Sequence, residues 1–154
     1  MNDKSLYSTL LANAMALCSK REYCTDDIRT RLRSWGAGET DIEKILSTLV
    51  RENFLNETRY ASAFVRDKFN YNKWGKVKIA AHLRAKQIAP GIITSALNLI
   101  DDELYPRTMK EIITAHRRHI KAKNQFDLKG KLLRFGLSRG FESNLLYDLL
   151  NDPE

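Results

Sequence analysis

The chain has 154 residues, of which 26 are Lys or Arg and 19 are Asp or Glu, giving a formal net charge of +7. Its 43% hydrophobic content is typical of a soluble protein built as one domain or as a few small units in series. The N-terminus lacks a basic segment followed by an apolar run, and no run approaches the ~18 apolar residues of a membrane span. We therefore expect a cytoplasmic protein with no membrane segment.

Three prolines and seven glycines are too few for a many-turned β fold, so the composition favours helices. Cys18 and Cys24 are the two cysteines, and in a cytosolic chain we expect free thiols. The excess of positive charge points to nucleic acid or to an acidic protein surface as the partner.

Apolar residues at steps of three and four predict a first amphipathic helix over residues 6–17, ending near Lys20. Thr25 is the predicted N-cap of a second helix, which stops at the glycines of 36–38. Thr40 and Glu43 form a T-x-x-E capping box for a third helix. The first third of the chain is therefore predicted to hold three helices.

The middle of the chain repeats this order. Asn56 is the predicted N-cap of a helix whose apolar stripe ends at Phe69, and Trp74-Gly75 is the joint to a short helix. Pro90 suits the first position of the next helix, where its missing N–H costs nothing. Three helices are thus predicted here as well.

Apolar positions also recur at a spacing of about fifty residues, which indicates an internal repeat. The matched positions are Ile28, Ile79 and Leu128; Leu32, Leu83 and Leu132; Leu46, Leu97 and Leu146; and Leu49, Ile100 and Leu149. The helices predicted for the last third cover residues 107–123, 127–139 and 142–150. The predicted fold is all-α, with three-helix repeats at 1–55, 56–104 and 105–154 stacked in an elongated, curved array.

The positive charge is concentrated in two stretches. Residues 59–86 hold eight Lys or Arg against one acid, and residues 107–139 have a net charge of +8. A plain interpretation is a solvated helix face whose lysine stems cover apolar neighbours. The interleaved aromatic residues Tyr60, Tyr71 and Trp74 favour a binding surface for a long polyanion or a filament groove. By spacing, Tyr60, Phe64 and Phe69 are assigned to the core, whereas Trp74 is the better surface candidate.

No motif supports a catalytic or metal site. His116 and His119 lie three residues apart, but the arginines between them would repel a cation and the sequence supplies no convincing further ligands. The acidic cluster 101–103 is explained by a solvated helix end, and His82 by a surface position. Phosphate loops, nucleophile elbows and H-E-x-x-H are absent from the sequence. We therefore expect no enzyme activity and no cofactor, and a metal-dependent enzyme is only a distant alternative.

The run from Phe54 to Ala61, FLNETRYA, followed by Phe64-Val65-Arg66 and Trp74-Gly75-Lys76, resembles the signature of the RecX family of RecA modulators. Further matching positions are Ile79, Leu83, Lys86 and Ile88, the stretch 14–25 and Gly140-Phe141. The chain departs from the family at Lys73-Trp74-Gly75, where the joint often reads Tyr-Gly. It also has Lys76 and Lys78 where arginines are common, and a lysine lacks the planar fork for bidentate contacts.

The resemblance implies an array that lies in the groove of the RecA–DNA filament and lowers its ATPase, strand-exchange and co-protease activities in DNA repair and the SOS response. It implies a monomer that contacts RecA and, more weakly or through the filament, single- and double-stranded DNA. The expected contact residues are Arg59, Arg66, Lys73, Trp74, Lys76, Lys78, Arg84 and Lys86, with Arg117, Arg118, Lys129 and Lys131 as a second patch. The alternative is a general DNA-binding module of helical repeats that acts without RecA.

Overall fold

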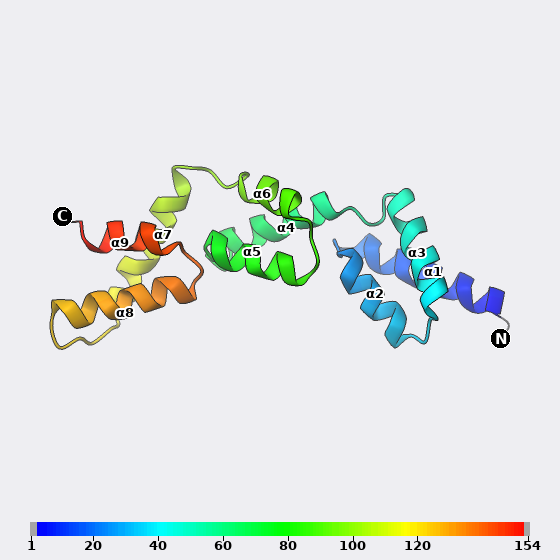
Figure 1. Cartoon of the computed structure of the whole chain (residues 1–154), viewed down its shortest axis with the longest axis horizontal. Helices are drawn as coiled ribbons and strands as arrows, with labels where there is room; N and C mark the ends of the chain where they lie inside the picture. The colour runs from blue at the N-terminus through cyan, green and yellow to red at the C-terminus, as the bar shows by residue number, and fades with distance from the viewer. Residues whose placement is uncertain (1–2, 153–154) are drawn as a thin grey trace.

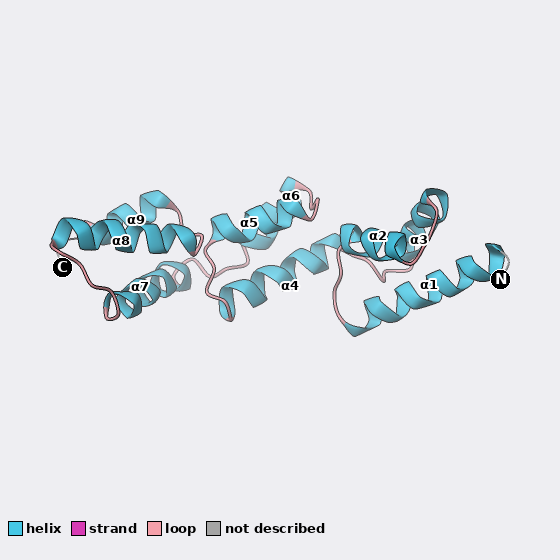
Figure 2. Ribbon diagram, turned by 90° about the horizontal axis from the view of Figure 1, so that it is seen from below, coloured by secondary structure: helices cyan, strands magenta, loops and turns pink. Residues whose placement is uncertain are grey.

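The computed structural model describes residues 3–152 as a row of helices, with the two ends of the chain at opposite ends of the row (Figure 1). No strand occurs within these residues (Figure 2). The helices are α1 (Asp3–Lys20), α2 (Thr25–Ser34), α3 (Glu39–Arg51), α4 (Glu57–Asn70), α5 (Lys76–Ala85), α6 (Pro90–Leu97), α7 (Leu104–Arg117), α8 (Gln125–Ser138) and α9 (Ser143–Leu150). The all-α, elongated repeat fold is confirmed.

Helix packing is closest inside consecutive triplets, α1–α3, α4–α6 and α7–α9, which we call repeats 1, 2 and 3. Apolar residues on facing sides of each triplet are buried, as the three- and four-residue spacing predicts. Ile28 in α2, Ile79 in α5 and Leu132 in α8 are each almost fully buried. The predicted limits of the repeats at 55/56 and 104/105 stay a prediction.

Two predicted caps were wrong. Cys24, not Thr25, is the N-cap of α2, and its Sγ accepts a hydrogen bond from the Asp27 N–H at 3.4 Å. Thr25 is the first helical residue of α2. Gly38 precedes α3 with no side-chain cap, so Thr40 lies one residue inside the helix and makes no capping box.

The first helix of repeat 3 differs from the predicted span 107–123. It begins earlier because Asp101 Oδ1 accepts hydrogen bonds from the N–H groups of Glu103 and Leu104 at 2.9 and 2.8 Å. It ends at Arg117, and the next residues form a loop held by α8, where Lys131 Nζ donates to the Lys121 carbonyl at 2.6 Å. The sequence gives no Gly or Pro to mark this end.

The buried residues divide into two clusters that do not follow the three repeats. One cluster lies within residues 10–55, in repeat 1. The other runs continuously through repeats 2 and 3 and includes a single buried residue of repeat 1, Cys24. Repeats 2 and 3 therefore share a core, whereas repeat 1 has its own.

Backbone groups join repeats 2 and 3 directly. The Gly75 N–H donates to the Arg139 carbonyl at 2.8 Å, and the Val77 N–H donates to the Gly140 carbonyl at 2.9 Å. Gly140 has a φ of +95°, and a Cβ on either glycine would overlap the backbone or side chain across the joint. Because the two turns approach this closely, the α4–α5 joint of repeat 2 is fixed by repeat 3.

Candidate functional site

The turn between α4 and α5 carries the predicted centre of the basic surface. Lys73 occupies the left-handed region with φ 57° and is exposed. The Trp74 N–H donates to the Lys68 carbonyl at 3.0 Å, and Gly75 then begins α5 as its N-cap. This geometry presents Lys73 at the tip of the turn.

The Trp74 ring is half-buried and lies within a cluster of rings and ammonium groups. Its centroid is 4.6 Å from the His82 ring and 6.4 Å from the Phe64 ring. The ammonium groups of Lys78 and Lys68 lie 4.5 and 4.9 Å from the indole centroid, within the range of cation–π attraction. Trp74 thus orients two lysines. His82, expected to be solvated, is exposed, but its ring lies tilted against Trp74 and stacks on Phe64.

Lys76 belongs to the joint with repeat 3 as well as to the basic surface. Its N–H donates to the Tyr105 hydroxyl at 2.9 Å, and its ammonium lies 4.6 Å from the Tyr105 ring. The Tyr105 hydroxyl in turn donates to Glu142. Burial, and then this bond to the carboxylate, raise the pKa of Tyr105. The phenol therefore stays protonated and acts as a hydrogen-bonded link.

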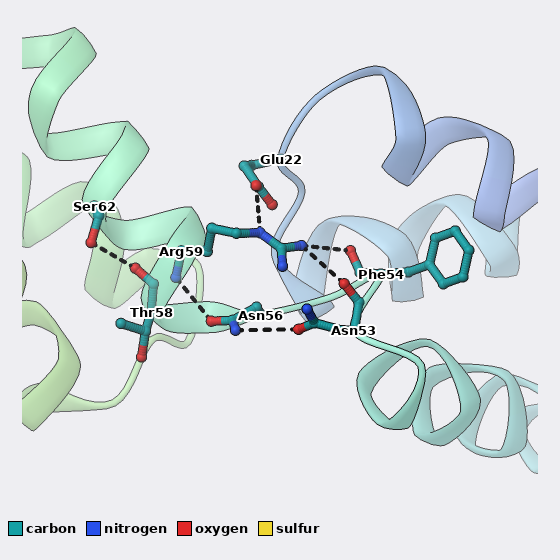
Figure 3. Close-up of polar contacts among 7 residues, drawn as sticks. All are labelled: Glu22, Asn53, Phe54, Asn56, Thr58, Arg59 and Ser62. Atoms are coloured by element: carbon teal, nitrogen blue, oxygen red, sulfur yellow. Dashed lines mark hydrogen bonds and ion pairs between the residues drawn. The ribbon is translucent and has the colours of Figure 1, made fainter.

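Two of the expected contact residues join repeat 1 to repeat 2. Arg59 Nε donates to Glu22 Oε2 at 2.5 Å, and its Nη2 donates to the carbonyls of Asn53 and Phe54 (Figure 3). Lys86 Nζ donates to Asp27 Oδ1 at 2.6 Å. These side chains are partly committed to ion pairs across the joint.

Asp27 is the acid in one of these pairs. Burial raises its pKa, but the hydrogen bond and charge of Lys86, together with hydrogen bonds from Cys24, outweigh burial, so the pKa of Asp27 is lowered overall. The pKa of Glu57, which faces Thr25 beside the same joint, is raised by burial. The joint between repeats 1 and 2 is therefore polar, and it holds two carboxyl groups whose pKa values are shifted in opposite directions.

The other expected contacts are accessible to different degrees. Arg66 is exposed and lies 3.8 Å from the neighbouring Asp67, and Arg84 is exposed on α5. Arg117 and Arg118 are exposed at the end of α7. Lys129 is exposed on α8 and lies 3.4 Å from the Asn151 amide oxygen, whereas Lys131 is paired with Asp127 at 3.3 Å. The structure brings together Lys73, Trp74, Lys76 and Lys78, and leaves the second patch as a separate surface on repeat 3.

Sequence reasoning missed Lys68 of α4, which lies over both Trp74 and Phe64. Its spacing from Trp74 gave no helical signal because the α4–α5 turn lies between them. The carboxylate partners Glu22 and Asp27 were missed too, since each lies far away in the sequence from its cation.

The described residues hold no group of three or more His, Cys, Asp or Glu placed to bind a metal ion. Burial raises the pKa of the Cys24 thiol to about 12, so this thiol is protonated and unreactive at neutral pH. In residues 3–152 no helix combines the length and the apolar content needed to cross a membrane. The side chains of the site can therefore bind a partner through charge and through aromatic stacking.

Comparisons with known proteins find RecX proteins that are similar to this chain in sequence and in fold. Residues 56–97 match the family model described as RecX, second three-helix domain, and these residues contain α4, α5 and the cluster around Trp74. The regulatory protein RecX of Clostridium acetobutylicum is 29% identical over 97% of this chain and 70% of the relative. The regulatory protein RecX of Herminiimonas arsenicoxydans is 27% identical over 97% of this chain and 95% of the relative. That of Clostridium beijerinckii is 27% identical, and the match spans 62% of its length.

Two crystal structures share the fold. RecX from Lactobacillus salivarius superimposes with a TM-score of 0.80 at 22% identity, covering 95% of both chains. A second structure, of regulatory protein RecX, gives a TM-score of 0.86 at 21% identity and covers 99% of this chain and 80% of the other. The family model over residues 56–97, the relatives and the shared fold all show that this chain is similar to RecX proteins.

Proposed function

We propose that this protein is a RecX-type regulator that binds the RecA–DNA filament and lowers its ATPase, strand-exchange and co-protease activities. The observation that carries the proposal is the pair of basic stretches, 59–86 and 107–139, on successive repeats of one elongated array. Many weak contacts along such an array add up to tight binding of a long anionic assembly. Relatives named regulatory protein RecX support the same role.

The exposed tip of the α4–α5 turn is the proposed centre of this contact. Lys73 and Lys78 supply charge, and Trp74 holds the Lys78 ammonium in place. Arg59 and Lys86 contribute less, since each already neutralises a carboxylate across the joint. The second patch on repeat 3 would extend the contact along the filament.

The test is RecA ATP hydrolysis on single-stranded DNA with substoichiometric amounts of the protein. We expect slower hydrolysis for the wild type, and unchanged turnover at saturation would contradict the proposal. The triple variant Lys73→Glu, Lys76→Glu, Lys78→Glu should lose inhibition while its helical circular dichroism stays intact. The matched control, Lys4→Glu, Lys20→Glu, Lys44→Glu, changes the same charge on exposed sites of repeat 1 and should inhibit like the wild type.

The second candidate is a DNA-binding module that acts without RecA. The ring and ammonium cluster around Trp74 favours it, because such clusters stack on bases while cations neutralise phosphates. Tight binding to DNA alone that weakens steeply with salt, together with no RecA in a pull-down, would establish it in place of the regulator.

A further inference from the structure

One side of α8 has a partly exposed apolar stripe, in which Leu133 packs against the core. Phe126, Gly130, Leu133 and Leu137 follow one another at steps of four, three and four residues, which keeps them on one side of the helix. Phe126 is 88% exposed and Leu137 is 45% exposed. A glycine lies in the middle of the stripe, where it leaves the helix backbone uncovered.

The facing side of α9 completes a groove. Tyr147, which is 52% exposed, and Leu150 lie opposite the stripe of α8, and the two helices pack side by side at the C-terminal end of the row (Figure 2). Phe126, Gly130, Leu133, Tyr147 and Leu150, with Lys129 and Asn151, enclose a cavity of about 470 Å³. We call this cavity the α8–α9 groove.

The repeat fold does not require this groove. At the positions of Phe126, Gly130, Leu133 and Tyr147, the fifty-residue repeat places Asp26, Thr30, Arg33 and Ser47 in repeat 1 and Val77, Ala81, Arg84 and Asn98 in repeat 2. These positions are all polar in repeat 1 and half polar in repeat 2, although the corresponding helix pairs pack together in each repeat. Packing of the helix pair therefore does not require the apolar lining found in repeat 3.

Gly130 points to close approach by another backbone or side chain. A glycine inside a helix costs about 1 kcal/mol relative to alanine. A Cβ at this position would meet only the Arg134 guanidinium, at 3.5 Å, so nothing in the described chain requires its absence. An external helix lying along the groove would benefit from the missing side chain.

The charges beside the groove define the partner. Lys129 lines the cavity and is exposed, and its ammonium donates to the neutral Asn151 amide oxygen at 3.4 Å, so it can also contact a carboxylate of a partner. Arg134 is exposed on the same helix. Among the lining residues Lys129 is the one cation and the remainder are mostly apolar, so the cavity suits apolar side chains framed by acids better than a phosphate backbone.

We infer that the α8–α9 groove docks an amphipathic helix of a protein partner, with apolar side chains in the cavity and carboxylates beside Lys129 and Arg134. This inference rests on the proposed function, under which the partner is the RecA protein of the filament. The α4–α5 turn, in contrast, meets the DNA. The two surfaces then divide the filament contact between a protein site and a nucleic-acid site.

The experiment compares two groove variants with a control. Phe126→Ser with Tyr147→Ser removes exposed rings, and Gly130→Leu fills the floor while raising helix propensity. Val50→Ser is the control, because it removes an exposed apolar side chain, 54% exposed, from α3 of repeat 1. Binding to immobilised RecA without DNA is measured by biolayer interferometry, and binding to labelled single-stranded DNA by fluorescence anisotropy.

We expect both groove variants to bind RecA at least about tenfold more weakly, with DNA affinity within about twofold of wild type and the control unchanged on both. Unchanged RecA affinity in the groove variants would overturn the assignment. An equal loss of DNA affinity would show instead that the groove stacks on bases.

A second probe separates this inference from the proposed function. It is a labelled model helix with leucines at steps of three and four and flanking glutamates, compared with the same helix carrying lysines. The glutamate helix should bind the wild type and lose affinity for both groove variants, even if the protein fails to bind RecA. Equal binding of the two helices, or binding that ignores the groove variants, would refute the groove chemistry itself.

Discussion

Gly75 and Gly140 show how two single residues fix the joint between repeats 2 and 3. The backbone of each turn occupies the space that a side chain on the other would need. The two N–H···O=C bonds across the joint depend on this approach. Gly140 also has a positive φ, a region that costs a residue with a Cβ about 1–2 kcal/mol.

Gly140→Ala should therefore destabilise the protein through two effects, the backbone conformation and the overlap with Lys78. The matched control is Gly36→Ala, because Gly36 has φ +90° but open space around its missing Cβ. Urea unfolding followed by circular dichroism should give a loss for Gly140→Ala that exceeds the control by roughly 1–3 kcal/mol, the usual cost of overpacking. Equal losses would mean that the close approach contributes nothing.

The residue-scale partners were the least predictable part of the site. Trp74 was predicted to be a surface residue because lysines flank it, yet its ring packs on Phe64 and His82 from two helices. Arg59 and Lys86 were predicted as contact residues for the partner, and the carboxylates they pair with lie 37 and 59 residues away in the chain. Periodicity reports the face of a helix, but it carries no information about partners from another repeat.

At the scale of the helix, some caps were predictable from the sequence. The Asn56 side chain accepts from the Arg59 N–H at 2.9 Å, as the sequence predicted, and Pro90 lies in the first turn of α6. Thr25 is not the cap of α2 because the helix begins one residue earlier than predicted, and the Cys24 Sγ accepts the capping hydrogen bond. Cysteine is not among the residues that usually cap helices, so no signal in the sequence pointed to it.

Asn56→Ala removes the cap of α4, the helix that begins beside the polar joint. We expect a loss of about 1 kcal/mol in the free energy of unfolding, typical of an N-cap asparagine. Asn56→Asp is the rescue variant, since a carboxylate caps equally well and favours the positive end of the helix dipole. Unfolding midpoints of the three proteins check this, and an alanine variant as stable as the wild type would contradict it.

At the scale of the whole molecule, the row of helical triplets was predictable because the buried positions recur at a fixed spacing. The difference between the repeat 1–2 joint and the repeat 2–3 joint was not predictable. Repeats 2 and 3 share a core and backbone hydrogen bonds, whereas repeat 1 is held to repeat 2 mainly through ion pairs and the buried Cys24. The apolar positions matched at a spacing of about fifty residues describe the inside of each repeat. They carry no information about the contacts between one repeat and the next.

The polar joint predicts that repeat 1 moves against a rigid body made of repeats 2 and 3. Both ion pairs are partly exposed, so salt near 1 M, with a Debye length of about 3 Å, should weaken them. Spin labels at Thr30→Cys and Thr94→Cys, in a Cys18→Ala background, measure repeat 1 against repeat 2. Labels at Thr94→Cys and Ser143→Cys measure repeat 2 against repeat 3. Only the first distance distribution should broaden when salt is added.

Acid should act on the same joint. Because the pKa of Asp27 is lowered in the folded protein, its pair with Lys86 contributes fully above about pH 4 and is lost as the pH falls through the lower folded value. Asp27→Asn should broaden the distribution of distances between repeats 1 and 2 already at neutral pH and low salt, and remove the part of its acid dependence that comes from the Asp27–Lys86 pair. If salt, acid and Asp27→Asn leave that distance as narrow as the one between repeats 2 and 3, the ion pairs do not hold the joint, and its rigidity must come from the packing around Cys24.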